Sequence, residues 1–229
     1  QHSRCTKWHA YDYMQWYSCS SLIINNIKEV EALKHEKIKV AEKRKNEICE
    51  AAKRCFLAKG FSKTGMEDVI KEVGMSKGGV YHHYKSTVDM LYDIMLKGND
   101  YRFNKVSDFI EKNPDMSLEE MAVELVIAKM FDENDFMSIY AMFLMECKEN
   151  SRLRKLRDEM KSNLTLEFLD FLEKNNLEYL KPLTNDDFMK LMDSMYIAGE
   201  FIDIRDTFLN KSDLFRDIIY NYLQKKSNR

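Results

Sequence analysis

The chain has 229 residues, of which 45% are hydrophobic and 32% charged, a balance that excludes a disordered protein. No apolar run approaches the roughly 20 residues that a membrane-spanning helix needs, so no such helix is expected in this sequence. Only seven glycines and two prolines occur, and the turns that join antiparallel strands are nearly absent. The composition therefore predicts an all-α protein.

Charge and cysteine usage narrow the setting. Residues 41–89 carry ten basic and seven acidic side chains, whereas residues 90–229 carry 20 and 27. A basic segment on an acidic body is typical of a protein that binds a polyanion at one end, although such asymmetry also arises by chance. The five cysteines are scattered and odd in number, in a chain too large to need a disulfide framework, and they indicate a reducing cytoplasm.

Residues 1–39 are predicted to form an atypical N-terminal extension. Both tryptophans, Trp8 and Trp16, lie within residues 1–27, where no sustained periodicity occurs. The apolar run Leu22-Ile23-Ile24 is too short for the core of a signal peptide. The extension is either an anchoring arm or, more simply, a non-native or poorly ordered leader.

Helix-like, highly charged sequence runs from about residue 28 to residue 59. Near its end, four residues recur at the spacing of one apolar helical face, namely Ile48, Ala52, Cys55 and Phe56. Gly60 is expected to end this helix, because glycine readily adopts the left-handed conformation found there.

Residues 61–84 have the pattern of two short helices joined by a turn that contains glycine. Thr64 precedes the acidic pair Glu67-Asp68, which predicts a helix N-cap followed by an acidic first turn. Gly74 follows this helix, and Ser76 is placed to cap the next one. This is the arrangement of a helix-turn-helix motif, whose second helix enters the major groove of DNA.

The second of these helices carries small, basic and hydrogen-bonding residues in a row. They are Lys77, Gly78, Gly79, Tyr81, His82 and His83. A glycine inside a helix costs about 1 kcal/mol, a cost that makes sense where the backbone must approach another molecule closely. An ordinary helical hairpin is the alternative on these residues alone.

The run from Ile48 to Leu91 resembles the DNA-binding domain of the tetracycline-repressor (TetR) family. The end of that family's first helix is matched by Phe56-Leu57-Ala58-Lys59-Gly60-Phe61. The helix-turn-helix motif that follows is matched by Asp68-Val69-Ile70-Lys71-Glu72-Val73-Gly74-Met75-Ser76-Lys77-Gly78-Gly79-Val80-Tyr81, and then by Tyr84-Lys85-Ser86. The match covers roughly a fifth of the chain. Gly65 and Thr87-Val88 depart from the family pattern, which bears on affinity and target sequence more than on the fold.

The resemblance implies a three-helix DNA-binding domain at residues 40–88 and a larger helical domain for ligand binding and dimerisation at residues 89–229. Within the first domain, Lys77 and Gly78 would contact base edges. The remaining candidates for the DNA-facing surface are Thr64, Ser76, Gly79, Tyr81, His82, His83 and Lys85, most of them as contacts to the phosphate backbone, which fix register without reading sequence.

Beyond residue 86 the apolar spacing predicts one helix after another. Helices are expected from about Thr87 to Asn113 and from Ser117 to about Asp132. Four more stretches of helical spacing follow, at residues 136–147, 153–172, 186–206 and 213–224.

Methionine and aromatic residues crowd the middle helices. The candidate lining of an effector pocket is Met121, Phe136, Tyr140, Phe143, Cys147, Phe168, Met192 and Tyr196. Flexible apolar side chains suit a small lipophilic ligand, and the family resemblance implies that such a pocket exists. Simple core packing explains the same residues equally well.

The resemblance also implies that the last two long helices pair with those of a second subunit. The candidate interface residues are Phe188, Met195, Gly199, Ile202, Leu214, Ile218 and Tyr222. Two apolar stripes would leave an exposed patch on a monomer, so we expect a homodimer.

No pattern in the sequence points to catalysis, a cofactor or a metal. A glycine-rich phosphate loop, His-x-x-x-His and Cys-x-x-Cys are all absent, and adjacent His82 and His83 would point about 100° apart on a helix. The resemblance to the TetR family implies a cytoplasmic regulator, most simply a repressor that a small, lipophilic molecule releases from a palindromic DNA operator. A helical protein-interaction module without operator binding is the alternative, and an enzyme is a more distant one.

Overall fold

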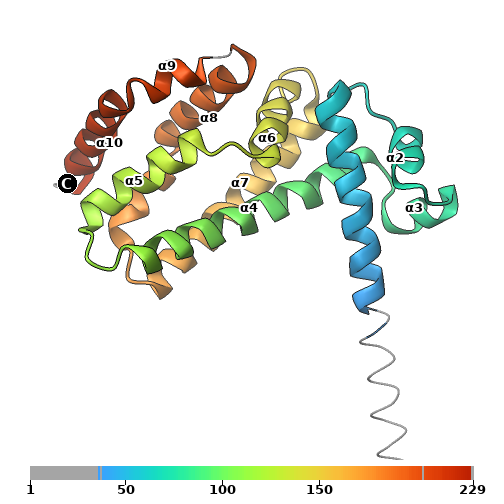
Figure 1. Cartoon of the computed structure of the whole chain (residues 1–229), viewed down its shortest axis with the longest axis horizontal. Coiled ribbons are helices and arrows are strands. Elements are labelled where there is room, and N and C mark those ends of the chain that lie inside the picture. Colours follow the sequence, from blue (N-terminus) through green and yellow to red (C-terminus); the bar gives the residue numbers. More distant parts are fainter. Residues whose placement is uncertain (1–35, 37, 203, 228–229) are drawn as a thin grey trace, which may run out of the picture. The chain divides into compact units, whose positions relative to one another are not determined.

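The structure is a computed structural model that describes residues 36, 38–202 and 204–227 (Figure 1). The chain divides into two units, residues 1–47 and 48–229, which we take separately. In the first unit, the described residues 36 and 38–47 are helical, and Ile38 and Val40 are exposed. Most of the predicted N-terminal extension lies outside the described residues.

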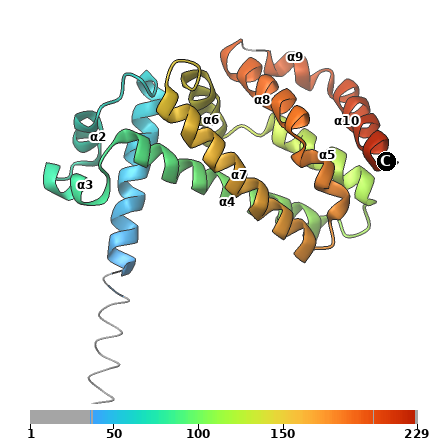
Figure 2. The same ribbon diagram turned by 180° about the vertical axis from the view of Figure 1, so that it is seen from behind.

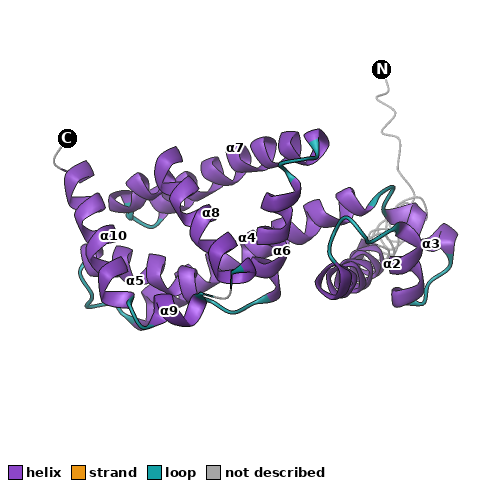
Figure 3. Ribbon diagram, turned by 90° about the horizontal axis from the view of Figure 1, so that it is seen from above, coloured by secondary structure: helices purple, strands orange, loops and turns teal. Residues whose placement is uncertain are grey.

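The second unit consists of helices joined by short connections. Figure 3 shows helices and loops, with no strand among the residues that are described. The predicted all-α class is therefore confirmed. The domain boundaries predicted at residues 40 and 88 stay a prediction.

The helix-turn-helix region, residues 48–84, has the three helices that its sequence predicts. Residues 48–59 are helical, and Gly60 follows with a φ of 85°, in the left-handed region that favours glycine. The next helices are α2 (Met66–Val73) and α3 (Lys77–His83). Between them Gly74 adopts a φ of 68° and caps the C-terminus of α2.

The four helices that come next begin at capping side chains. They are α4 (Thr87–Lys112), α5 (Leu118–Phe131), α6 (Asp135–Glu146) and α7 (Ser151–Lys174). Ser86, Ser117, Asn134 and Asn150 each accept a hydrogen bond from a backbone N–H in the first turn of the helix that follows. The predicted starts at Thr87 and Ser117 are confirmed.

The chain ends with η1 (Glu178–Thr184, a 3-10 helix), α8 (Asp186–Phe201), α9 (Arg205–Leu209) and α10 (Ser212–Ser227). Helix α10 packs against α5, and α6 packs against α8, as the two opposite views in Figures 1 and 2 agree. The predicted single helix over 186–206 is wrong, because α8 stops at Phe201 and α9 begins separately at Arg205.

Two hydrophobic clusters form the core of the second unit. One joins the helix-turn-helix region to α4, α6 and α7, and it contains Ile48, Phe56, Leu91 and Phe143. The other joins α5, α8 and α10 with η1, and it contains Met121, Leu180, Met192 and Leu223. Tyr140 on α6 packs against both clusters, which places it where movement in one can reach the other.

None of the helices described here is long and apolar enough to span a membrane. Cys49, Cys55 and Cys147 are free thiols, while Cys5 and Cys19 lie outside the described residues. Burial raises the pKa of each of these three thiols. They are packing residues in this fold.

Candidate functional site

The predicted N-cap of α2 is wrong by one residue. Gly65 is the N-cap, and its N–H donates to the carboxylate of Asp68 at 2.7 Å. Thr64 is only 6% exposed, and its hydroxyl donates to the carbonyl oxygen of Gly60 at 2.8 Å and to that of Cys55 at 3.3 Å. Thr64 therefore closes the end of the preceding helix, and its hydroxyl does not reach a surface where DNA could bind.

The start of α3 is as predicted. Ser76 is the N-cap, and its hydroxyl oxygen accepts a hydrogen bond from the N–H of Gly79 at 3.2 Å. Lys77 follows with its side chain 66% exposed and its Nζ 2.6 Å from a carboxylate oxygen of Glu67. This hydrogen bond raises the pKa of Lys77. An exposed pair of this kind contributes little to stability, so Lys77 can exchange Glu67 for another acceptor.

The two glycines of α3 have different structural explanations. A Cβ at Gly79 would lie 3.2 Å from the Ser76 hydroxyl oxygen, which is tight enough to disturb the cap. A Cβ at Gly78 would meet nothing within 4 Å. The packing of the chain thus accounts for Gly79, whereas Gly78 leaves open space on an exposed helical surface.

The rest of the predicted DNA-facing set lies on or just after α3. Tyr81 and His83 are partly exposed, and His82 is exposed with its ring 5.1 Å from that of His83. Lys85 is exposed, and its ammonium donates to the carbonyl oxygen of Tyr81 at 2.6 Å. Apart from Thr64, the structure therefore brings the predicted residues together around one short helix.

A buried side-chain network holds α3 in place. Tyr84, 3% exposed, donates to a carboxylate oxygen of Asp93 on α4 at 2.7 Å. Its hydroxyl also lies 3.0 Å from the sulfur of Cys49, on the helix of residues 48–59. Because three helical segments meet at this hydroxyl, the network fixes the end of α3 relative to α4.

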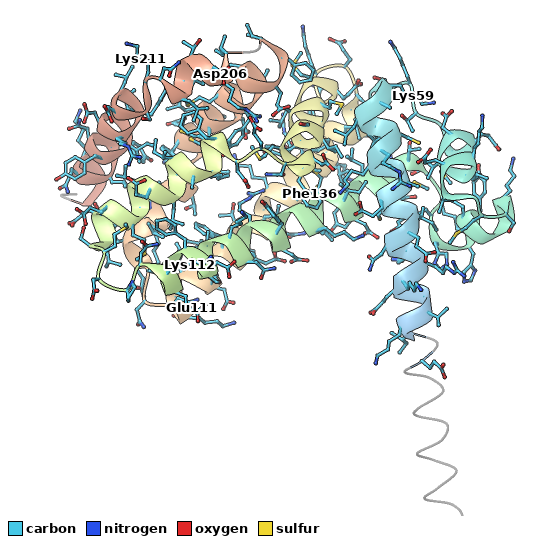
Figure 4. The ribbon with its side chains drawn as sticks, viewed as in Figure 1. Lys59, Glu111, Lys112, Phe136, Asp206 and Lys211 are labelled. Carbon is cyan, nitrogen blue, oxygen red and sulfur yellow. The ribbon has the colours of Figure 1, made fainter. Side chains whose placement is uncertain are left out.

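Two ion pairs that the sequence analysis did not select join α2 to the helix of residues 48–59. Arg54 lies 2.7 Å from Glu72, and Lys59, labelled in Figure 4, lies 2.5 Å from Asp68. The hydrogen bond from Lys59 is the main cause that lowers the pKa of Asp68, followed by the N–H of Gly65. These cations therefore hold the motif together in this structure.

The predicted effector residues are divided between the two hydrophobic clusters, and an effector pocket formed by them stays a prediction. Phe143 and Cys147 belong to the core around the helix-turn-helix region, whereas Met121 and Met192 belong to the other core. Phe168 stacks on Phe103 and Phe171. Tyr196 borders a cavity of about 10 Å³, room for a single water molecule. Its other lining residues are Met130, Phe131, Asp132, Met137, Met195, Gly199, Glu200, Arg205 and Phe208.

A polar cluster lies beside Tyr196, between α4, α5, α6 and α8. Tyr140 donates to a carboxylate oxygen of Asp193 at 3.0 Å, and the rings of Tyr140 and Tyr196 are 6.3 Å apart. The Lys129 ammonium lies 5.4 Å from the centre of the Tyr196 ring. Burial lowers the pKa of Lys129 to about 7, with the positive charge of Arg102 as the second cause. The sequence analysis missed both cations, because they lie on different helices, α4 and α5, and come near each other only in the fold.

Helix α6 connects this cluster to the helix-turn-helix region. At its start, Asp135 lies 3.4 Å from the ammonium of Lys53, which also sits 5.1 Å from the centre of the Phe136 ring (Phe136 is labelled in Figure 4). At its end, Glu146 accepts a hydrogen bond from Ser62. Both ends of α6 therefore contact the helix-turn-helix region.

The predicted interface residues separate into buried and exposed groups. Phe188 is 5% exposed and stacks on Tyr222 of its own chain with ring centres 4.8 Å apart, so the structure places these two inside the subunit. Met195 and Gly199 line the small cavity. Ile202, Leu214 and Ile218 are 65%, 55% and 44% exposed. The core face of α10 is formed by Ile219 and Leu223.

Exposed apolar residues gather at this end of the chain. Seven of the thirteen large hydrophobic residues found exposed among those described lie between residues 191 and 220, and we call them the C-terminal patch after their place in the sequence: Leu191, Phe201, Ile202, Leu209, Leu214, Ile218 and Tyr220. Groups of histidine, cysteine or acidic side chains that could hold a metal ion do not occur in the described part of the chain.

Comparison with known proteins shows what the helix-turn-helix region is similar to. Residues 48–94 match the family of bacterial regulatory proteins described as the tetR family. An HTH-type transcriptional regulator of Bacillus subtilis, YfiR, is 40% identical over 92 residues, which are 40% of this chain and 41% of that protein. IcaR of Staphylococcus epidermidis, the negative transcriptional regulator of the biofilm operon icaADBC, is 23% identical over 78% of this chain and 96% of its own.

Solved structures show the same fold. GusR of Salmonella enterica aligns with a TM-score of 0.58 at 16% identity, covering 79% of this chain and 95% of that one. A Mesorhizobium loti protein assigned to the TetR family aligns with a TM-score of 0.52 at 15% identity, covering 78% and 96%. Residues 48–94 are therefore similar to bacterial regulatory proteins of the tetR family, and the solved structures show the fold that the larger part of the chain shares with them.

Proposed function

We propose that the protein is a dimeric, cytoplasmic transcriptional repressor that inserts α3 into the major groove of a near-palindromic operator and leaves it when a small molecule binds. The observation that carries the proposal is the exposed start of α3. There the exposed cation of Lys77 lies beside Gly78. No contact within the chain explains why residue 78 is a glycine. Lys77 and Gly78 would face base edges, and Ser76, Tyr81, His82 and Lys85 would face phosphates.

Two features support a dimer, namely the geometry of a palindromic operator and the C-terminal patch. Two recognition helices on one two-fold axis read half-sites about 34 Å apart along the duplex. The patch offers the apolar surface through which two copies could associate, since monomeric proteins rarely leave such surface uncovered.

Release would pass through α6 and α4. The polar cluster contacts the middle of α6 through Tyr140, while Asp135 and Glu146 contact the helix-turn-helix region from its two ends. Arg102 of the same cluster stands on α4, which begins directly after that region. A ligand that shifts these helices would rotate the two recognition helices out of register. The coupling needed is modest, about 1–3 kcal/mol, and reciprocal.

The test is selection of DNA sequences with the full-length protein, followed by binding measurements at several salt concentrations. We expect a near-palindrome, an affinity that falls steeply with salt, and a loss of about 1–3 kcal/mol for Lys77→Ala concentrated at one base position. Lys63→Ala, an exposed lysine of the same region outside α3, is the control. Failure to select any sequence would favour the protein-interaction module instead.

A further inference from the structure

The polar cluster contains one buried hydrogen-bond donor without an acceptor, and two cations that form no ion pair among the described residues. Tyr196 is 5% exposed, and its hydroxyl has no hydrogen-bond partner among the described residues. Lys129 and Arg102 are partly exposed, and neither forms an ion pair with another described residue. A buried hydroxyl without a partner is costly, so the Tyr196 hydroxyl calls for an acceptor from outside the chain, and the two cations nearby favour a negatively charged one.

The charges of the cluster are unbalanced toward positive. Lys129 and Arg102 contribute two cations, and Asp193 is the carboxylate whose charge acts on Lys129. Asp193 already accepts the hydrogen bond of Tyr140. The charges of Lys161 and Arg157 also act on Asp193, but these two cations have carboxylate partners of their own in Asp186 and Asp158. Lys129 and Arg102 thus share one carboxylate, which leaves room for a second negative charge.

We propose that the donors Arg102, Lys129 and Tyr196 bind the carboxylate head of an amphipathic organic acid, and that this acid is the effector of the protein. The inference rests on the proposed function, and it replaces the predicted lipophilic effector with an anionic one. The apolar tail would enter beside Tyr196, where Met130, Met137 and Met195 border the small cavity. Methionine side chains are flexible enough to move aside for it.

Such a ligand would add a charged contact between helices that here share the hydrogen bond of Tyr140 with Asp193. Its carboxylate would draw together Arg102 on α4, Lys129 on α5 and Tyr196 on α8, close to Tyr140 on α6. Because α4 and α6 both reach the helix-turn-helix region, binding at this point acts on the two helices that could move it.

The experiment measures calorimetric binding of three matched eight-carbon probes to the full-length protein without DNA. Octanoate, octanol and octylamine share one tail and differ in the charge of the head. We expect octanoate to bind about tenfold or more tightly than either of the others, because charged hydrogen bonds are the strong ones. Equal binding of octanoate and octanol, no binding of octanoate, or tighter binding of octylamine would overturn the proposal.

Variants locate the site. Lys129→Met should weaken octanoate binding about tenfold and leave octanol unchanged, and Tyr196→Phe, which keeps the ring, should weaken it about threefold. Lys105→Met is the matched control, because Lys105 also lies 5.4 Å from a tyrosine ring, that of Tyr101, but is exposed. If Lys105→Met weakens binding as much as Lys129→Met, or if Tyr196→Phe changes nothing, the carboxylate is not held here.

The pH dependence provides a second readout. With a pKa of about 7, Lys129 is partly neutral in the free protein, and a bound carboxylate would favour its charged form. Octanoate affinity should therefore fall as the pH rises above about 7, and Lys129→Met should lose this dependence. The charged groups that act on Lys129 are Arg102 and Asp193, and the neighbouring phenols are Tyr196 and, through Asp193, Tyr140. Among these groups, Lys129 is the one expected to titrate near pH 7. If octanoate affinity still falls with pH in Lys129→Met, Lys129 is not the group that binds the carboxylate. Operator binding is measured separately, so a protein that binds octanoate but no DNA would refute only the proposed function.

Discussion

At Gly78, the DNA-binding role proposed for α3 and the stability of the helix make opposite demands on the residue. A methyl group at Gly78 meets nothing within 4 Å, and alanine is the better helix former by roughly 0.8–1 kcal/mol. Gly78→Ala should therefore raise the free energy of unfolding by about 0.5–1 kcal/mol while weakening operator binding, because the backbone can no longer approach the base edges. Chemical denaturation measures the expected gain in stability, and DNA titration of the same sample measures the expected loss of operator affinity.

Gly79→Ala is the comparison for that experiment. Its Cβ would crowd the Ser76 hydroxyl at 3.2 Å, so this variant should gain less stability than Gly78→Ala, or lose some. An operator affinity unchanged by Gly78→Ala would mean that α3 does not present this surface to DNA.

Thr64 provides the opposite case, a residue expected at the DNA that the fold uses internally. Thr64→Val keeps the shape and removes a buried hydroxyl that donates to Gly60 and Cys55. Stability should fall by about 1 kcal/mol, the usual net contribution of such a hydrogen bond. The operator affinity of the folded protein should stay unchanged, and Thr64→Ser should retain most of the stability. A large loss of operator affinity at equal stability would instead support the predicted contact between Thr64 and a DNA phosphate.

The sequence predicts local features of single residues and misses those that depend on distant ones. Ser76 and Ser117 are recognisable as caps because the groups they bind lie within one turn. Thr64 has the same local pattern, but the tertiary contact with Cys55 turns its hydroxyl inward. Lys129 and Asp193 come together only when α5 and α8 pack, so neither helix alone reveals the cluster.

Between elements, α4 and α6 meet at a point where little space is left. Gly98 is buried, and a Cβ there would lie 3.3 Å from three atoms of Phe136. Gly98→Val should overpack this contact and lower the free energy of unfolding by about 1–3 kcal/mol. Combined with Phe136→Ala, it should cost less than the sum of the two single variants, because the smaller partner makes room. Strictly additive losses in denaturation would show that the helices do not press on each other here.

The periodicity of the sequence predicts the helices, but it does not predict which face of each helix packs against the core. The spacing predicts that Leu214, Ile218 and Tyr222 form one apolar face of α10. In the structure Ile219 and Leu223 face the core of the subunit, whereas Leu214 and Ile218 lie exposed. Both rows are apolar, so the hydrophobic pattern of α10 has no unique inward face. The packing against α5 selects between them.

At the scale of the whole molecule, the exposed row on α10 calls for a second copy of the chain. Light scattering at micromolar concentration should give about twice the 27.3 kDa of one chain. Ile218→Glu places a charge in the C-terminal patch and should shift the mass toward that of one chain, while circular dichroism stays helical. Leu166→Glu, at a residue 67% exposed on α7 and outside the patch, should leave the dimer intact. Operator affinity should fall with the dimer, since one recognition helix contacts half as many phosphates as two. A wild-type mass of one chain would remove the basis for a palindromic operator, even with every contact of α3 intact.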